Sequence, residues 1–278
     1  MKSADTFSLN LCKSADRLPA ALTIAGSDSG GGAGIQADLK TFAALGVFGT
    51  TAITCLTAQN PTAVSRIDPV DPKMVAAQIR MVCEAFPVKA AKTGMLYSAG
   101  IIKSVARAVK KHRISRLVVD PVMIATSGAN LLRGDAIAAL YEDLLPLASV
   151  ITPNIQEAEI LADMEICTVL DMQIAAESIG RRWKTAVVVK GGHLGGRTVV
   201  NVLYDRGTMR TFELQRIKTG ATHGTGCTFS AAITAGLARG LSLPEAVEQA
   251  GRFVARALTN AVPVGRFKPL NILPLVPE

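Results

Sequence analysis

Thr222-His223-Gly224-Thr225-Gly226-Cys227-Thr228-Phe229-Ser230 indicates a glycine-rich turn that leads into a helix. Phe229, Ile233 and Leu237 recur at helical spacing, so one face of this helix is expected to pack inward. The amides in the first turn of a helix lack internal partners, and the helix dipole adds partial positive charge there. The stretch therefore predicts a place where the backbone meets a negatively charged group.

The chemistry of this turn depends on its glycines and its cysteine. Gly224 and Gly226 have no Cβ, so a ligand can approach the backbone closely. Cys227 lies where the turn meets the helix, and the same field is expected to shift its thiol toward thiolate. Gly224, Thr225 and Gly226 would then cradle a phosphoryl group while Cys227 accepts a proton. A plain helix start with a buried cysteine explains this segment equally well.

Composition narrows the classes of partner. The 278-residue chain is 49% hydrophobic and 19% charged, the balance of a globular protein with a large core. Its net charge is +8, but the basic residues are spread out and aromatic residues make up only 4%. Single-strand binding needs stacking residues among basic ones, so we expect no nucleic-acid partner and instead attraction of small anions. No apolar run approaches the length of a membrane span, so we expect no membrane partner.

Cysteine usage and the N-terminus indicate where the chain works. The five cysteines are odd in number and never spaced Cys-x-x-Cys. This argues against a disulfide framework or a structural zinc site and favours a reducing compartment, so we expect the cytoplasm. Residues 1–18 lack the apolar core of a signal peptide. We expect residues 1–18 to be a mobile extension and residues 19–278 to form a single domain.

Apolar runs alternate with helical patterns along the chain. The predicted strands are Ala20–Ala25, Thr50–Ala58, Val64–Val70, Val88–Ala91, Leu117–Val119, Ser149–Ile151, Ala186–Val189, Val199–Tyr204 and Thr208–Leu214. Helical patterns follow residue 34 and cover residues 71–86, 100–112, 135–145 and the segment after Ser242. This alternation favours an α/β fold of three layers, with a mostly parallel central sheet and a site along the carboxyl edge of its strands.

A second glycine loop covers residues 26–34, between the first strand and a helix. Gly32-x-Gly34-x-x-Ala37 matches a dinucleotide fingerprint, but the next strand ends in Gln59-Asn60 rather than in an acid that could hold a ribose. Asp38 lies about one turn inside the helix and leans back toward the loop. It either touches a ligand there or complements the helix dipole.

Polar residues follow several predicted strands. Gln59 either pairs with the edge of a heterocycle or belongs to a turn before proline. Met95 is either a core residue or a ligand contact. Asp120 follows three buried residues and requires an ion-pair partner or a metal. Lys190 is placed to neutralise phosphate charge.

Asn154 and Glu157 have the spacing of a helix cap with a reciprocal acid. The same two side chains suit Mg²⁺, or its waters, beside triphosphate oxygens. Spacing alone supports both interpretations equally.

The motifs form an ordered set over residues 20–261. Its members are Gly26-Ser27-Asp28-Ser29, Gly31–Lys40, Ala58-Gln59-Asn60, Gly94-Met95-Leu96, Asp120-Pro121-Val122-Met123, Thr152-Pro153-Asn154, Lys190-Gly191-Gly192-His193 and His223–Thr228. This ordered set resembles the hydroxymethylpyrimidine/phosphomethylpyrimidine kinases of thiamin biosynthesis, a family with a ribokinase-like fold.

The resemblance implies an activity and a set of roles. The activity is ATP-dependent phosphorylation of 4-amino-5-hydroxymethyl-2-methylpyrimidine and then of its monophosphate, with ATP and Mg²⁺ as cofactors and a homodimer as the assembly. The implied residues are Gly26, Asp38, Gln59, Met95 and Val122 for the pyrimidine, Lys190, Asn154 and Thr219 for ATP, Asp120 and Glu157 for the metal, Gly224, Thr225 and Gly226 for the anion hole, and Cys227 for the base.

The chain departs from the family pattern at a few positions, and alternatives follow from the same motifs. The departures are Gly30, Thr126, Ala129, Gly220-Ala221 and Val264-Gly265-Arg266-Phe267-Lys268. Charged and flexible residues at these positions would help phosphorylation of the monophosphate and the formation of a lid over the nucleotide. The alternatives are a pyridoxal kinase on the same scaffold, an NAD-dependent oxidoreductase resting on the weak fingerprint, and a catalytically weak pyrimidine-binding protein.

Overall fold

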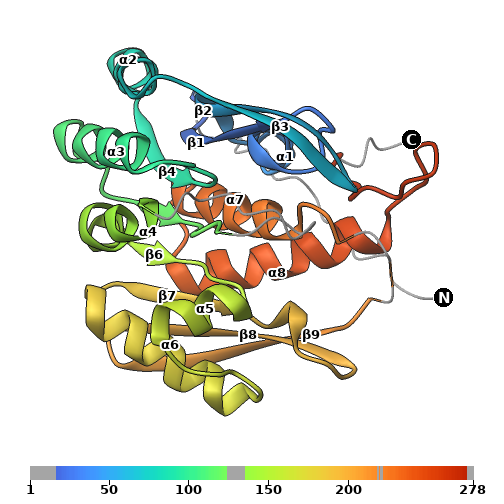
Figure 1. Cartoon of the computed structure of the whole chain (residues 1–278). Helices are drawn as coiled ribbons and strands as arrows, with labels where there is room; N and C mark the ends of the chain where they lie inside the picture. Colours follow the sequence, from blue (N-terminus) through green and yellow to red (C-terminus); the bar gives the residue numbers. More distant parts are fainter. Residues whose placement is uncertain (1–16, 124–134, 218, 220–221, 274–278) are drawn as a thin grey trace.

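The computed structural model describes residues 17–123, 135–217, 219 and 222–273 (Figure 1). Nine strands form one sheet in the order β3-β2-β1-β4-β5-β6-β7-β8-β9. They are β1 (Ala20–Asp28), β2 (Phe48–Asn60), β3 (Ala63–Pro69), β4 (Val88–Thr93), β5 (Leu117–Val119), β6 (Val150–Ile151), β7 (Ala186–Lys190), β8 (Thr198–Asp205) and β9 (Thr208–Gln215). Strands β2, β1, β4, β5, β6 and β7 pair in parallel, and β3, β8 and β9 are antiparallel. The predicted mostly parallel sheet is confirmed, with β3 at one edge.

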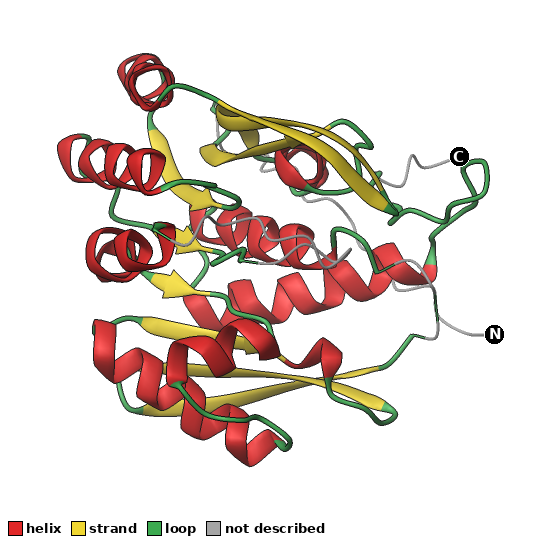
Figure 2. Ribbon diagram, in the orientation of Figure 1, coloured by secondary structure: helices red, strands yellow, loops and turns green. Residues whose placement is uncertain are grey.

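Helices cover both faces of the sheet and complete three layers (Figures 1 and 2). One face carries α1 (Gly34–Ala44), α7 (Thr225–Ala238) and α8 (Leu243–Thr259). The other carries α2 (Pro72–Ala85), α3 (Ala99–Lys111), α4 (Ala136–Ala139), α5 (Ile155–Ala162) and α6 (Val169–Trp183). Within the described residues, no helix is both long and apolar enough to cross a bilayer.

Alternate residues of each strand belong to different cores. In β5, Leu117 and Val119 pack among α2 to α6, whereas Val118 packs among α1, α7 and α8. Side chains of a strand alternate with a period of two, so Asp120 continues the row of Val118 toward α7. Lys190 at the end of β7 belongs to the same side of the sheet. The strand pattern thus aims several charged side chains at the start of α7.

Several element boundaries differ from the sequence prediction, and two of the differences have a clear physical reason. The strand β1 continues through Asp28, because Ser27 and Asp28 pair with β2 after a bulge, so the glycine loop starts later than expected. The helix predicted over residues 135–145 is α4 followed by a π-helical turn, η1 (Leu140–Leu144), and a 3₁₀ turn, η2 (Leu145–Leu147). Pro146 lacks an N–H group and lies in η2, the last of these turns, where a regular helix cannot continue.

Local capping follows the sequence closely. The Asp71 side chain accepts from the amide of Lys73 at the start of α2, and Ser242 and Glu245 form the predicted capping box of α8. The β8–β9 hairpin turns at Arg206 and Gly207 with φ angles of 48° and 85°, as its twist requires. The expected extension over residues 1–18 and the departures at Thr126, Ala129, Gly220 and Ala221 fall largely or wholly outside the described residues.

Candidate active site

The starts of α1 and α7 meet at the carboxyl edge of the sheet. Gly224 caps α7 with φ 82°, and no side chain caps this helix. A Cβ on Gly224 would lie 1.8 Å from the carbonyl oxygen of Gly32, and a Cβ on Gly32 would lie 2.6 Å from the His223 ring. Only glycines allow this approach, which brings two sets of first-turn amides together. The predicted glycine turn that leads into a helix is confirmed, and the helix begins at Thr225 rather than at Cys227, where the junction was expected.

Asp28 joins the glycine loop to this turn. Its carboxylate accepts hydrogen bonds from the amides of Gly30 (2.8 Å), Ala33 (2.8 Å) and Gly32 (3.1 Å), and Nε2 of His223 lies 3.0 Å away. Burial alone would raise the Asp28 pKa, but His223 and the amides outweigh it and hold the pKa below its usual value. Sequence reasoning assigned no role to Asp28 or His223, because they are far apart along the chain.

Cys227 lies on the first turn of α7 and is partly buried. Burial raises the pKa of its thiol to about 11, although Lys92 and the backbone amide of Gly34 oppose this. The expectation of a thiolate is therefore wrong for the protein alone. The loss of water around the sulfur outweighs the opposing effects of Lys92 and of the Gly34 amide on the thiol pKa.

Lys92 and Asp38 form a buried ion pair beneath the turn. Nζ of Lys92 donates to both carboxylate oxygens of Asp38, at 2.9 and 3.0 Å, and both side chains have 0% exposure. Thr23 donates its hydroxyl to the same carboxylate at 2.6 Å. Asp38 therefore does not line a ligand surface in this structure, which corrects that prediction. A lysine within a run of small strand residues was the missed signal for its partner.

Asp120 joins three elements. Its carboxylate accepts from Nζ of Lys190 at 2.7 Å, from the hydroxyl of Ser230 at 3.1 Å and from the hydroxyl of Thr152 at 3.3 Å. The predicted need for an ion-pair partner is met by Lys190. Burial would lower the Lys190 pKa, but Asp120 and Glu157 outweigh it and raise that pKa. Lys190 thus remains a cation at the edge of the sheet.

Glu157 and Asn154 form the capping box of α5, as their spacing predicts. The Glu157 carboxylate accepts from the Asn154 amide at 2.8 Å, and the Asn154 side chain accepts from the Glu157 amide at 2.9 Å. Burial and the charge of Asp120 raise the Glu157 pKa to about 7 against the opposing effect of Lys190. The backbone of Asn154 pairs with that of Lys190. These contacts bring the predicted phosphate and metal residues together.

The described residues contain no group of three or more His, Cys, Asp or Glu side chains arranged to hold a metal alone. Mg²⁺ in kinases needs only one or two carboxylates, because phosphate oxygens and waters complete its shell. Asp120 lies close enough for its charge to raise the pKa of Glu157. This pair fits a phosphate-bound Mg²⁺ and does not fit a metal held by protein alone.

A third, small apolar cluster lies apart from the two main cores. It contains Cys55 and Met95, with Ile67, Tyr97 and Val122 packed against them. A Cβ on Gly26 would lie 2.8 Å from Sγ of Cys55 and 3.4 Å from Sδ of Met95. Three predicted pyrimidine residues, Gly26, Met95 and Val122, are therefore brought together.

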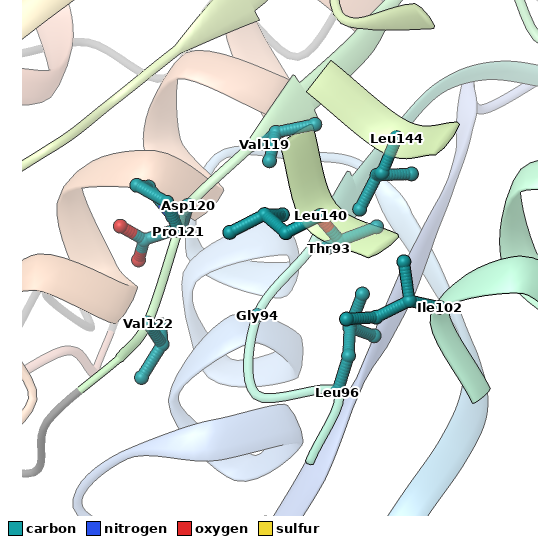
Figure 3. A pocket seen from close by; sticks show the side chains of 10 residues that line it. All are labelled: Thr93, Gly94, Leu96, Ile102, Val119, Asp120, Pro121, Val122, Leu140 and Leu144. Atoms are coloured by element: carbon teal, nitrogen blue, oxygen red, sulfur yellow. The ribbon is translucent and has the colours of Figure 1, made fainter. Parts of the chain in front are cut away.

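Gln59 and the neighbouring cavity complete this part of the edge. The backbone of Gln59 exchanges two 2.8 Å hydrogen bonds with the Ser29 hydroxyl, which holds β2 against the glycine loop. Figure 3 shows a cavity between the ends of β4 and β5, from which the Asp120 carboxylate points away. Its volume of about 10 Å³ holds one water molecule at most and excludes a heterocycle.

The loop after β7 is fixed by a residue that sequence reasoning missed. Arg216 donates to the carbonyl oxygens of Gly192 at 2.8 Å, Gly196 at 2.9 Å and Leu194. Thr219, predicted to bind ATP, follows this arginine closely in the chain. Residues 264–268 depart from the family pattern near the C-terminus. There the backbones of Val264 and Phe267 pair across a turn, and the Arg266 guanidinium lies over the Phe267 ring. Exposed Lys268 follows that turn.

Comparisons with known proteins agree on one family. The family model for phosphomethylpyrimidine kinase matches residues 28–271. The hydroxymethylpyrimidine/phosphomethylpyrimidine kinase of Rhizobium meliloti (strain 1021) is 49% identical over 242 residues, which cover 87% of this chain and 91% of that protein.

Solved structures extend this similarity to the fold. The phosphomethylpyrimidine kinase of Clostridium difficile 630 is 41% identical with a TM-score of 0.77, over 87% of this chain and 100% of that one. An ADP complex of Bacillus subtilis pyridoxal kinase is 42% identical with a TM-score of 0.84, over 91% of this chain and 97% of that one.

Proposed function

This chain belongs to the phosphomethylpyrimidine kinase family, and we propose that it phosphorylates 4-amino-5-hydroxymethyl-2-methylpyrimidine and then its monophosphate in thiamin biosynthesis. It is an ATP-dependent phosphotransferase. The observation that carries the assignment of phosphoryl transfer is the meeting of two sets of helix amides, uncapped by side chains, with a largely buried cation at one edge of the sheet. Such a site stabilises the negative charge that spreads over a phosphoryl group in transfer.

The terminal phosphate of ATP is proposed to bind at the start of α7. The amides of Gly226 and Cys227 belong to the first turn of α7, which no side chain caps, and Gly224 lets oxygen atoms approach. The amide of Thr225 donates to the carbonyl oxygen of Thr222 at 3.3 Å and would exchange this weak bond for one to phosphate. A Cβ on Gly226 would lie 3.4 Å from Nζ of Lys190, so the ammonium group supports the same place. Two more residues, Asn154 and Thr219, are proposed to contact the nucleotide beyond its terminal phosphate. The backbone of Asn154 pairs with that of Lys190.

Asp120 and Glu157 are proposed to hold Mg²⁺ together with phosphate oxygens. When bound, this ion neutralises the charge of the transferring phosphate and orients it. Glu157 is a buried acid whose pKa is raised to about 7, so a nearby divalent cation favours its ionised form. Lys190 balances the charge of Asp120 before the nucleotide arrives.

The pyrimidine is proposed to lie over the Cys55–Met95 cluster, between the glycine loop and Val122. Gly26 lets the backbone lie directly against the two sulfur atoms, because a Cβ there would be 2.8 Å from Sγ of Cys55 and 3.4 Å from Sδ of Met95. Gln59 offers amide donors and acceptors to the ring edge. Asp38 is proposed to act indirectly, through its ion pair with Lys92. The hydroxymethyl group of the bound pyrimidine would then face Cys227.

Cys227 is proposed to orient the hydroxymethyl group through its thiol and, only in the fraction of the protein in which it is a thiolate, to take the hydroxymethyl proton late in the transfer. A thiol with a pKa of about 11 is a neutral hydrogen-bonding group at pH 7 rather than a standing base. Phosphoryl transfer through a loose transition state requires little help from a base, so positioning contributes most. We expect Cys227→Ala to lower kcat by about 10²-fold, and full turnover in this variant would exclude the role.

The proposed function is tested with three substrates side by side. Purified protein, ATP and Mg²⁺ are incubated with the hydroxymethylpyrimidine, with its monophosphate and with pyridoxal, and products are identified by mass spectrometry. We expect both pyrimidine phosphorylations, with pyridoxal as a slower substrate. Preference for pyridoxal would favour the second candidate, which rests on similarity to the Bacillus subtilis pyridoxal kinase. Calorimetric binding of the pyrimidine without turnover would favour a binding protein.

We also propose that the enzyme acts as a homodimer in the cytoplasm. Cys55, Cys83, Cys167 and Cys227 are free, as is usual where thiols stay reduced. Light scattering of the purified protein measures its mass, and a monomer at micromolar concentration would contradict the dimer.

A further inference from the structure

Tyr97 has a backbone conformation that tyrosine rarely adopts. Its φ angle is 67°, and the amide of Ser98 donates to the carbonyl oxygen of Leu96 at 2.8 Å. A hydrogen bond that spans one residue with positive φ is a γ-turn of the strained kind. In L-residues with a Cβ this conformation persists only when the surroundings enforce it.

The position of Tyr97 separates it from the other strained residues. Four more described non-glycine residues have positive φ, and each ends a helix or turns a hairpin: Arg113, Asp163, Lys184 and Arg206. Such places accept the left-handed conformation routinely. Tyr97 instead lies between the end of β4 and Ser98, the N-cap of α3, at the carboxyl edge of the sheet.

The strained turn determines where the Tyr97 side chain lies. The side chain is partly buried and packs against Cys55 and Met95, together with Val122. Thr54 fixes Met95 from the other side by donating to its carbonyl oxygen at 2.6 Å. The strained backbone therefore holds an aromatic ring beside the two sulfur atoms that lie next to Gly26.

We propose that Tyr97 is a specificity-determining residue whose ring forms one wall of the heterocycle pocket and limits the number of ring substituents that fit. This inference rests on the proposed function, because it takes the Cys55–Met95 cluster as the seat of a flat six-membered nitrogen heterocycle. The ring contacts such a heterocycle through its face or edge. Pyridoxal carries one more ring substituent than the hydroxymethylpyrimidine, so the wall disfavours pyridoxal.

The test compares Tyr97→Gly, Tyr97→Ala and Tyr97→Phe with the unchanged protein. For each, kcat/KM is measured for the hydroxymethylpyrimidine and for pyridoxal, and KM is measured for ATP. We expect glycine and alanine to shift the ratio of the two kcat/KM values toward pyridoxal by about 3- to 10-fold. Phenylalanine keeps the ring and should keep the ratio within about twofold, and KM for ATP should stay unchanged in all three.

Lys184→Gly is the matched control. It also removes a left-handed non-glycine residue, at φ 54°, but at the C-cap of α6 rather than beside the cluster. Its substrate ratio should equal that of the unchanged protein. Thermal unfolding of each variant identifies any loss of fold before the kinetics are compared.

The outcomes separate this inference from the proposed function. If the unchanged protein phosphorylates a heterocycle but Tyr97→Gly and Tyr97→Ala keep its substrate ratio, only the inference is overturned. A Tyr97→Phe variant that behaves like Tyr97→Gly would also overturn it, because the ring alone would then not matter. If the unchanged protein neither phosphorylates a heterocycle nor binds one by calorimetry, both the proposed function and the inference fail.

Discussion

Nε2 of His223 lies 3.0 Å from Oδ2 of Asp28, which precedes it by 195 residues. The contact ties the loop before α1 to the turn before α7. Asp28 is only 2% exposed, and its carboxylate accepts its other hydrogen bonds from loop amides, so it links the two helix starts. The geometry of the proposed phosphate site therefore depends on residues that need not touch a substrate.

His223→Phe should remove this link between the two helix starts. The turn would lose its link to the loop, and a buried carboxylate would lose one of its partners. We expect kcat to fall by about 10-fold or more, since small displacements of positioning groups are costly in phosphoryl transfer. Steady-state kinetics with the pyrimidine check this. His112→Phe, at the C-cap of α3, is the control. Equal kcat values for His223→Phe and the unchanged protein would contradict the role.

Lys92→Met should destabilise the fold strongly. It would leave the Asp38 carboxylate buried without its cation, which costs about 3–5 kcal/mol. The double variant Lys92→Met, Asp38→Leu should recover much of this loss, because neither charge remains. Urea unfolding measures all three proteins. Breaking the exposed Arg252–Glu248 pair with Arg252→Met should cost far less, since water already screens it. A Lys92→Met protein as stable as the parent would refute the ion pair.

Alkylation of Cys227 should depend steeply on pH. Because burial raises its pKa to about 11, the thiol is protonated at pH 7, and its reaction with iodoacetamide should accelerate about tenfold per pH unit up to that value. Lys92 lowers this pKa, so Lys92→Met should raise it and slow alkylation at a given pH. Peptide mass spectrometry follows the modification, with Cys227→Ser as the blank. Rapid alkylation at pH 7 would show that a thiolate is present after all.

Glu157→Gln should raise the Mg²⁺ concentration needed for half-maximal activity. The amide keeps a hydrogen-bonding oxygen for the α5 cap but removes the charge that is proposed to hold the ion. We expect a shift of about 10-fold or more, and chelation of Mg²⁺ should abolish turnover. Magnesium titrations of the initial rate measure this. Glu213→Gln, on the exposed side of β9, is the control. An unshifted titration would remove Glu157 from the metal site.

Much of the fold follows from local sequence. Helix caps such as Asn154 with Glu157 require partners only three residues apart, so their geometry is already present in the chain. The strands before Asp120 and Lys190 are short apolar runs, and the carboxyl ends of parallel strands meet at one edge. The turn that leads into α7 was also predictable from its glycines and the apolar spacing that follows, to within two residues of the observed start at Thr225.

Only the tertiary structure decided which charges meet. Asp38 is 54 residues from Lys92, and Asp120 is 110 residues from Ser230, and no spacing rule reaches so far. These pairs depend on the order β2-β1-β4-β5 in the sheet and on the packing of α1 and α7 against it. Burial also reversed the expected state of Cys227, since the sequence places the thiol in a favourable field but only packing removes its water. Sequence alone thus determined the strands, most of the helices and the polar ends of the strands, while the partner and the protonation of each buried group came from long-range packing.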